Sequence, residues 1–150
     1  YTEDGNVYAE VMDRLARKFK TALNYLPEPE ISDMKKQKLG MVFIGSTNIV
    51  IQEVLDNLGK KGIFLDTMCI KAFPFHKSVK TFIDNHELVY VIDQNRDSQL
   101  KSLLKLESNI NEEKMYSISN YNGVLITAGH IEEAILESMP NLQETSEVPA

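Results

Sequence analysis

The sequence predicts an α/β fold of three layers, α/β/α, with helices on both faces of a mostly parallel sheet. Two observations predict it. Short apolar runs that end in polar or glycine-containing turns alternate four times with helical patterns, and the runs at 39–44 and 88–92 are almost continuously apolar, as strands buried on both faces are. At 150 residues and 43% apolar content, the chain has room for one domain with a core of its own.

Residues 1–37 are predicted to form a helix followed by a connector. Apolar residues recur about every four positions between 6 and 23, and Asp4 or Asn6 can cap this helix. Pro27 and Pro29 then impose an extended stretch. We expect the helix either to pack on the compact domain or to dock on something absent from the chain. Because the first residue is Tyr and not Met, we expect the chain to be a piece of a longer polypeptide.

The compact domain is predicted to span residues 38–140, with 141–150 as a polar, disordered tail. Each predicted strand is followed by a helix, and the last helix is expected to stop at Pro140. We label the predicted strands A (39–44), B (63–72), C (88–92) and D (115–119) in chain order. Right-handed crossovers then lead to a sheet in which the strands lie side by side in the order B-A-C-D.

Two polar turns are therefore predicted to be neighbours, because the strand order reverses between 39–44 and 88–92 and ligands bind outside the carboxyl ends of strands at such a point. The candidate ligand or interface residues in these turns are Gly45, Ser46, Thr47 and Asn48 after one strand, and Gln94, Asn95, Arg96 and Asp97 after the other.

Each turn has a simpler interpretation. Ser46 and Thr47, with the free N–H groups of the next helix, suit an anion, but the same residues are common N-caps. Arg96 can bind a carboxylate or phosphate bidentately or contact a partner domain, or it can pair with Asp93 or Asp97 and rigidify the turn. Asp97 can cap the following helix.

Composition argues against several classes of function. A net charge of −6 disfavours a nucleic-acid-binding surface. Cys69, the one cysteine, excludes an internal disulfide and a thiolate cluster, and it is expected to be a core residue. The histidines show no metal-ligand spacing and no catalytic triad, and no apolar run reaches the roughly 18 residues that cross a membrane. We therefore expect a cytoplasmic protein without catalytic or metal-binding residues in this chain.

Two stretches resemble the alpha subunit of 2-oxoacid:ferredoxin oxidoreductases, most of all the 2-oxoglutarate type. They are AFPF at 72–75 and HELVYVIDQNRDSQL at 86–100, and the opening residues and the turn at 45–47 are similar as well. The resemblance implies a domain like the C-terminal domain of transketolase, with a fifth, antiparallel edge strand that the sequence does not place.

The resemblance also implies a function for the whole enzyme. Such an enzyme decarboxylates a 2-oxoacid on thiamine diphosphate with Mg²⁺, passes electrons through iron–sulfur clusters to ferredoxin, and forms acyl-coenzyme A. The cofactors are then held by the beta subunit and by another alpha-subunit domain, and none is bound by this chain. This piece would serve assembly and the approach of coenzyme A.

Two other interpretations remain open from the residues alone. The chain can be a free-standing α/β module that binds a nucleotide or small anion where the strand order reverses, or a scaffold with no ligand.

Overall fold

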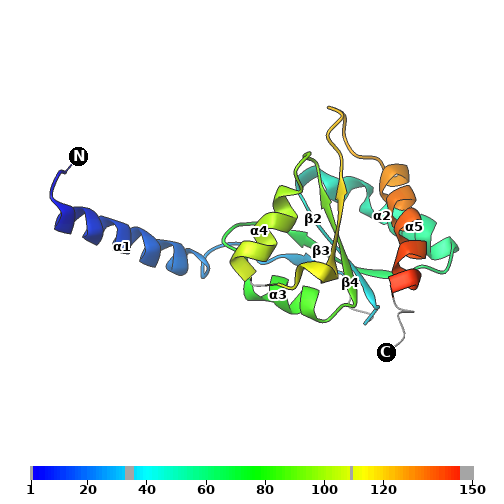
Figure 1. Cartoon of the computed structure of the whole chain (residues 1–150), viewed down its shortest axis with the longest axis horizontal. Helices are drawn as coiled ribbons and strands as arrows, with labels where there is room; N and C mark the ends of the chain where they lie inside the picture. The colour runs from blue at the N-terminus through cyan, green and yellow to red at the C-terminus, as the bar shows by residue number, and fades with distance from the viewer. Residues whose placement is uncertain (1, 33–35, 109, 146–150) are drawn as a thin grey trace.

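The computed structural model describes residues 2–32, 36–108 and 110–145, and in it a five-stranded sheet lies between two layers of helices (Figure 1). The strands are β1 (Glu30–Ile31), β2 (Leu39–Ile44), β3 (Leu65–Ile70), β4 (Leu88–Asp93) and β5 (Met115–Ser119). The helices are α1 (Gly5–Ala22), α2 (Asn48–Lys60), α3 (Lys77–Asp84), α4 (Gln99–Ser108) and α5 (Ala128–Thr145), with 3₁₀ turns at η1 (Gly45–Thr47) and η2 (Glu112–Lys114).

The predicted strand order is confirmed. The sheet runs β1-β3-β2-β4-β5, and β3, β2, β4 and β5 are parallel to one another. The reversal of order falls between β2 and β4, as predicted, so the turns that follow these two strands open at the same edge of the sheet. We call this edge, where the parallel strands end, the carboxyl edge.

The fifth strand is β1, which pairs antiparallel with β3 through Glu30 opposite Cys69 and Ile31 opposite Met68. It comes directly after the two prolines, in the stretch expected to be a connector. Ser32 extends the contact, since the backbone N–H of Thr67 donates to Ser32 Oγ at 2.9 Å. A strand of two residues gives no periodic signal in a sequence, which is why the pattern did not place it.

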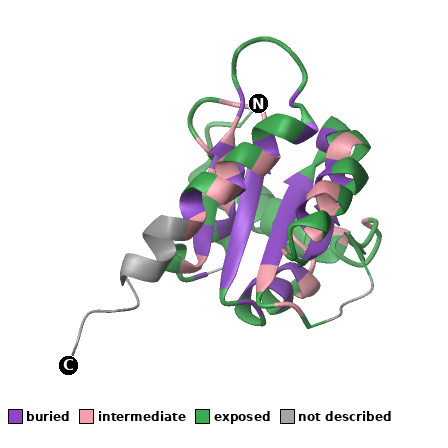
Figure 2. Cartoon of the chain, turned by 90° about the vertical axis from the view of Figure 1, so that its right-hand side faces the viewer, coloured by how far each residue is buried: buried purple, intermediate pink, exposed green. Residues whose placement is uncertain are grey.

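Alternate residues of each strand face different layers, as the pleat requires. Met41 and Phe43 of β2 pack with α2 and α5, whereas Val42 packs with α3 and α4. Burial coloured on the structure shows the central strands enclosed on both sides (Figure 2). Cys69 is buried in the core, as predicted, and burial raises the pKa of its thiol.

Helix α5 differs from the prediction because it continues through Pro140 to Thr145. A proline inside a helix removes one backbone donor and can be accommodated without ending the helix. Residues 141–145, expected in the tail, are therefore helical, and residues 146–150 lie outside the described part of the chain.

Helix α1 begins as predicted, with the carboxylate of Asp4 accepting from the N–H of Asn6 at 2.8 Å. It contains no buried residue and extends away from the compact domain (Figure 1). The sequence left two outcomes open for this helix, and the first, packing on the compact domain, is not observed.

Candidate functional site

The two predicted turns meet through Gln94, the first residue after β4. Its amide Nε2 donates to Ser46 Oγ at 3.0 Å and to Thr47 Oγ1 at 3.2 Å. The prediction that the turns lie side by side is therefore confirmed, and the contact is direct.

A third loop, between β5 and α5, joins the same cluster. The N–H of Ile126 donates to Gln94 Oε1 at 3.3 Å, so the Gln94 amide uses both of its ends. Asn120 ties the start of this loop to β4, because its N–H donates to the carbonyl of Asp93 at 3.0 Å. Sequence analysis missed Asn120 and Ile126, although an asparagine directly after a predicted strand is the kind of signal that identified Gln94.

The turn before α4 is organised by Asp93 and Asn95, and the prediction that Asp97 caps this helix is wrong. Asp93 Oδ2 accepts from the N–H of Leu100 at 2.7 Å, and Asn95 Oδ1 accepts from the N–H groups of Asp97 and Gln99, both at 3.1 Å. Asp93 is buried at the end of β4, so its carboxylate is held where the helix N–H groups point.

Arg96 and Asp97 form an ion pair at the surface. Arg96 Nε lies 2.7 Å from Asp97 Oδ1, and the two side chains are 72% and 56% exposed. This is the simpler of the interpretations considered for Arg96. The pair is neutral overall, which weakens the attraction of this turn for an anion.

Ser46 and Thr47 do not act as N-caps of α2. Residue Thr47 stands before the helix but its side chain accepts no hydrogen bond from the first turn, and it is buried with its hydroxyl bound by Gln94. Gly45 has φ +59, a backbone angle that side chains disfavour, and this angle starts the 3₁₀ turn. Asn48 begins α2 and is exposed.

Exposed apolar side chains surround the polar cluster. The loop between β5 and α5 stands above the sheet in Figure 1 and is exposed along most of its length in Figure 2. Its residues and Gln94 line a hollow of about 410 Å³. We define the apolar rim as the exposed large apolar residues of this edge, which are Ile44, Ile49, Phe73, Tyr121, Val124 and Leu125.

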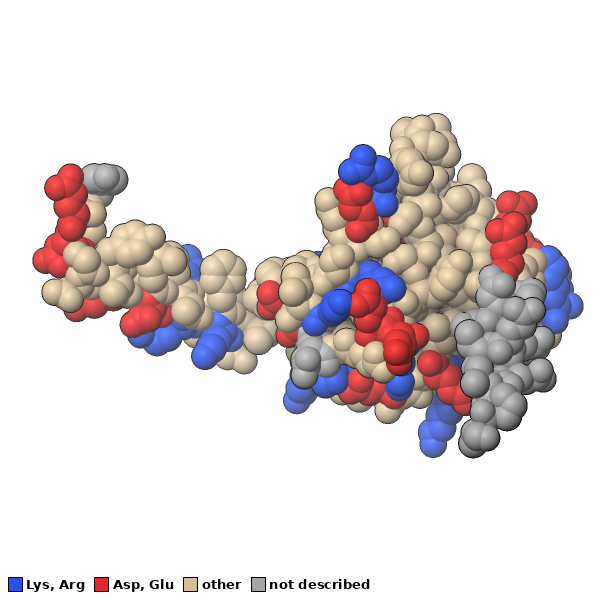
Figure 3. Space-filling model, viewed as in Figure 1, with Lys and Arg blue, Asp and Glu red and all other residues tan. Residues whose placement is uncertain are grey.

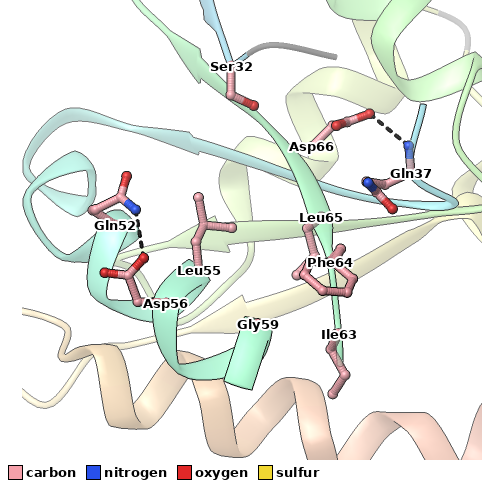
Figure 4. A pocket seen from close by; sticks show the side chains of 10 residues that line it. All are labelled: Ser32, Gln37, Gln52, Leu55, Asp56, Gly59, Ile63, Phe64, Leu65 and Asp66. Atoms are coloured by element: carbon pink, nitrogen blue, oxygen red, sulfur yellow. Dashed lines mark hydrogen bonds between the residues drawn. The ribbon is translucent and has the colours of Figure 1, made fainter. Parts of the chain in front are cut away.

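The opposite edge of the sheet holds a cavity of about 470 Å³ between α2 and the start of β3 (Figure 4). Two hydrogen bonds occupy polar groups of its wall, Gln52 to Asp56 and the Gln37 N–H to Asp66. Nearby, the buried His86 places Nε2 3.3 Å from Asp66 and donates from Nδ1 to the carbonyl of Phe82. No group of His, Cys, Asp and Glu in the described residues could hold a metal ion.

Comparison with known proteins gave matches only among solved structures. No family model matches the chain, and no curated protein does. The chain is similar over 92% of its length to the structure of 2-oxoglutarate:ferredoxin oxidoreductase from Magnetococcus marinus, which has 2-oxoglutarate, coenzyme A and succinyl-CoA bound, with a TM-score of 0.78 and 19% identity. It spans 24% of that protein's chain.

Two further structures share the arrangement of the compact domain. The alpha chain of a probable 2-oxoacid ferredoxin oxidoreductase from Thermoplasma acidophilum matches 75% of this chain and 97% of its own, with a TM-score of 0.51 and 25% identity. A split-gene transketolase, an inactive beta4 tetramer, matches 74% of this chain and 42% of its own, with a TM-score of 0.56 and 14% identity.

The chain has the fold of a 2-oxoacid:ferredoxin oxidoreductase domain. The resemblance seen in the sequence is thereby confirmed, and the transketolase match supports its C-terminal-like form. Within this 2-oxoacid:ferredoxin oxidoreductase fold, the cluster around Gln94 lies at the carboxyl edge and β1 is the antiparallel edge strand that the resemblance implied. The Magnetococcus match covers 92% of this chain, which is more than the residues after α1 make up. The match therefore extends into α1.

Proposed function

We propose that this chain is a domain of the alpha subunit of a 2-oxoacid:ferredoxin oxidoreductase, one that acts on 2-oxoglutarate. Its own role is assembly, with the carboxyl edge as the docking surface, while the decarboxylation takes place in other parts of the enzyme. The observation that carries the proposal is the composition of this edge, where polar groups bound to one another are surrounded by exposed apolar side chains.

Docking to protein fits this edge better than catalysis. The hydroxyls of Ser46 and Thr47 accept from Gln94, and the guanidinium of Arg96 is neutralised by Asp97, so none of them is poised as a nucleophile or as an isolated charge. Apolar side chains that surround a satisfied polar centre are instead typical of a surface that a partner covers.

The proposal assigns the remaining chemistry to partners. Thiamine diphosphate with Mg²⁺ supplies the carbanion chemistry, iron–sulfur clusters carry the electrons to ferredoxin, and these groups are held by the beta subunit and another alpha-subunit domain. One feature supports this division: the chain spans 24% of the chain of the Magnetococcus structure that it matches. The proposed compartment is the cytosol, and the described residues contain no helix long and apolar enough to cross a membrane.

Assembly is tested by co-expressing the chain with the beta subunit and the remaining alpha-subunit domain. Changing Leu125 to Asp is expected to reduce co-purification about tenfold, because it places a charge in the apolar rim. Leu106→Asp is the matched control, since Leu106 is even more exposed than Leu125 but lies near the end of α4, away from the carboxyl edge. Equal retention of the two variants would contradict the proposal.

Activity is tested on the chain alone. Mixed with 2-oxoglutarate, coenzyme A, thiamine diphosphate, Mg²⁺ and an oxidised viologen dye, the chain is expected to leave the dye oxidised. Reduction of the dye by the chain alone would show that the chemistry resides here and would refute the division of roles.

A second candidate function is direct contact with coenzyme A, which the hollow beside Gln94 favours. A ligand that binds only the folded state raises the melting temperature. A rise with coenzyme A that disappears in Arg96→Ala would assign the approach of coenzyme A to this edge. A rise with ADP or phosphate on the isolated chain would instead favour a free-standing nucleotide- or anion-binding module.

A further inference from the structure

The loop between β5 and α5 contains an asparagine directly followed by a glycine, and no other asparagine of the chain precedes a glycine. These residues are Asn122 and Gly123, and both are exposed in a segment that forms neither helix nor strand. Gly123 has φ +85, and a Cβ built on it would meet no atom of the described residues within 4 Å, its chain neighbours excepted. The backbone nitrogen of Gly123 is therefore open to the side chain that precedes it.

A hydrogen bond folds the side chain of Asn122 back over the main chain. The N–H of Val124 donates to Asn122 Oδ1 at 3.1 Å, which closes a turn of the Asx type. Because this bond spans Gly123, it holds the side-chain amide of Asn122 over the backbone of that residue. The bond also draws electrons away from Cγ, as a donor in an oxyanion hole does, and makes this carbon a better electrophile.

We propose that Asn122 is a site of spontaneous deamidation, and that docking of the carboxyl edge protects it. The Gly123 nitrogen loses its proton to hydroxide and attacks Cγ of Asn122, an intramolecular step that proximity accelerates. The N–Cγ bond forms, the Cγ–Nδ2 bond breaks, and ammonia leaves with a proton taken from water. Water then opens the cyclic imide at either carbonyl carbon and gives aspartate or isoaspartate. Water is consumed and ammonia released, with no change in oxidation state.

Asn120, in the same loop, has the opposite environment. It is 7% exposed, and its Nδ2, the leaving group of such a reaction, donates to the carbonyl of Val124 at 2.8 Å. It is followed by Tyr121, whose side chain obstructs the approach to the next nitrogen. The two asparagines of the loop are therefore expected to differ widely in reactivity, and Asn120 is the internal control for Asn122.

The reaction changes the chemistry of the apolar rim. Residues 120–127 carry no charged side chain, and the space-filling view shows an uncharged projection at this place (Figure 3). Deamidation puts a carboxylate, ionised at neutral pH, between Tyr121 and Val124, which are both exposed members of the rim. Its effect on assembly rests on the proposed function, whereas the reaction itself does not.

The first test follows the folded chain by mass spectrometry over several days in neutral buffer. The chain is expected to gain the mass difference between water and ammonia, and fragmentation is expected to assign the gain to Asn122 and not to Asn120. Raising the pH from about 7.5 to about 8.5 is expected to accelerate the gain about tenfold, because the nucleophile is the deprotonated nitrogen. No gain at Asn122, or an equal gain at both asparagines, would overturn the proposal.

The second test separates the turn from the dipeptide. Ile49→Gly creates another Asn-Gly pair at the start of α2, where Ile49 is 79% exposed and its loss removes little packing. Asn48 has the helical angles φ −54 and ψ −28, and a helical side chain is tilted away from the next nitrogen. In this variant Asn122 is expected to react about tenfold faster than Asn48. Equal rates would show that the dipeptide alone decides and would refute the role of the turn.

The third test compares the free chain with its complex with the beta subunit and the remaining alpha-subunit domain. In the complex the gain at Asn122 is expected to be about tenfold slower, because a partner on the apolar rim fixes the turn and excludes water. Asn122→Asp, which carries the product charge from the start, is expected to lower co-purification about threefold. The two proposals fail separately. No gain in the free chain overturns the deamidation, whereas the same rate of gain in the complex supports the deamidation and contradicts the docking of this edge.

Discussion

Gln94 connects three segments that are far apart in the chain. Its amide nitrogen serves the turn after β2, and its amide oxygen serves the loop before α5. A side chain with both donor and acceptor at its end can do this, whereas a carboxylate of the same length offers acceptors only.

Changing Gln94 to Ala is expected to lower the free energy of unfolding by about 1–3 kcal/mol, because it removes these bonds and leaves the part-buried partners unsatisfied. Urea denaturation measures the difference. The control is Gln52→Ala, which removes one exposed bond to Asp56 and is expected to cost no more than about 0.5 kcal/mol. Similar losses for the two variants would contradict the role given to Gln94.

Gly40 permits a close approach between β2 and the buried His86. A Cβ at this position would lie 2.9 Å from Phe82 Cε1 and 3.0 Å from His86 Cγ. Gly40→Ala is therefore expected to lower the free energy of unfolding by about 1–3 kcal/mol, since both rings are buried. In contrast, Gly59→Ala meets only Phe64 at 3.8 Å and should stabilise α2 by about 0.5–1 kcal/mol. The same denaturation experiment compares them.

Tyr90 makes stability depend on pH in alkaline solution. Burial raises the pKa of its hydroxyl above the ordinary 10.0, and the hydrogen bond with Ser138 partly offsets this. The unfolded chain then loses the Tyr90 proton before the folded one, so this contribution to stability is complete below pH 10 and is lost as the pH rises further.

Tyr90→Phe is expected to be less stable than the parent at neutral pH by about 0.5–1.5 kcal/mol, because the bond to Ser138 is lost. Above pH 10 its stability should fall less steeply than that of the parent. Thermal denaturation across this range measures how steeply the stability of each protein falls with pH. The pKa of Cys69 is raised by burial as well, but this thiol contributes equally to both proteins and does not affect the comparison. Parallel slopes would show that Tyr90 does not titrate as described.

At the scale of elements, α1 and the compact domain are held together by the connector alone. Helix α1 buries no residue, whereas the two-residue strand β1 that follows it is bound to β3. The stability of the sheet therefore does not depend on α1.

Removing residues 1–24 is expected to leave the melting temperature within about 2 °C, while the helical signal in circular dichroism decreases. The measurement is made at about 1 µM, where self-association adds little. A fall of more than about 5 °C would show that α1 packs on the domain in solution.

At the scale of the whole molecule, burial increases from the edges of the sheet to its centre. Every residue of β4 is buried, while edge strand β1 is exposed and edge strand β5 buries only Met115 and Ile118. The centre of the sheet is covered by α2 and α5 on one face and by α3 and α4 on the other.

Amide hydrogen exchange is expected to be slowest in β2 and β4 and faster in β1 and β5, because central strands open only when the whole domain unfolds. Exchange followed by mass spectrometry at peptide level resolves these strands. Faster exchange in β4 than in β5 would contradict this order of stability.

The sequence by itself determined the layers, the four parallel strands, their order and the meeting of the two polar turns. These follow from local rules, namely the apolar period of each segment and the handedness of crossovers, which act without knowledge of particular contacts. The sequence also carried the resemblance to 2-oxoacid:ferredoxin oxidoreductases, most of it in the stretch at 86–100. In the structure this stretch includes β4 and the turn that follows it.

Only the tertiary structure decided which groups bind one another. Asp93 and Asn95, not Asp97, serve the start of α4, and the Ser46 and Thr47 hydroxyls are bound by Gln94 instead of capping α2. The placement of β1 beside β3 and the approach of His86 to Gly40 are of the same kind. Each depends on the position of one chain segment relative to another distant in sequence, and no periodicity within either segment contains that information.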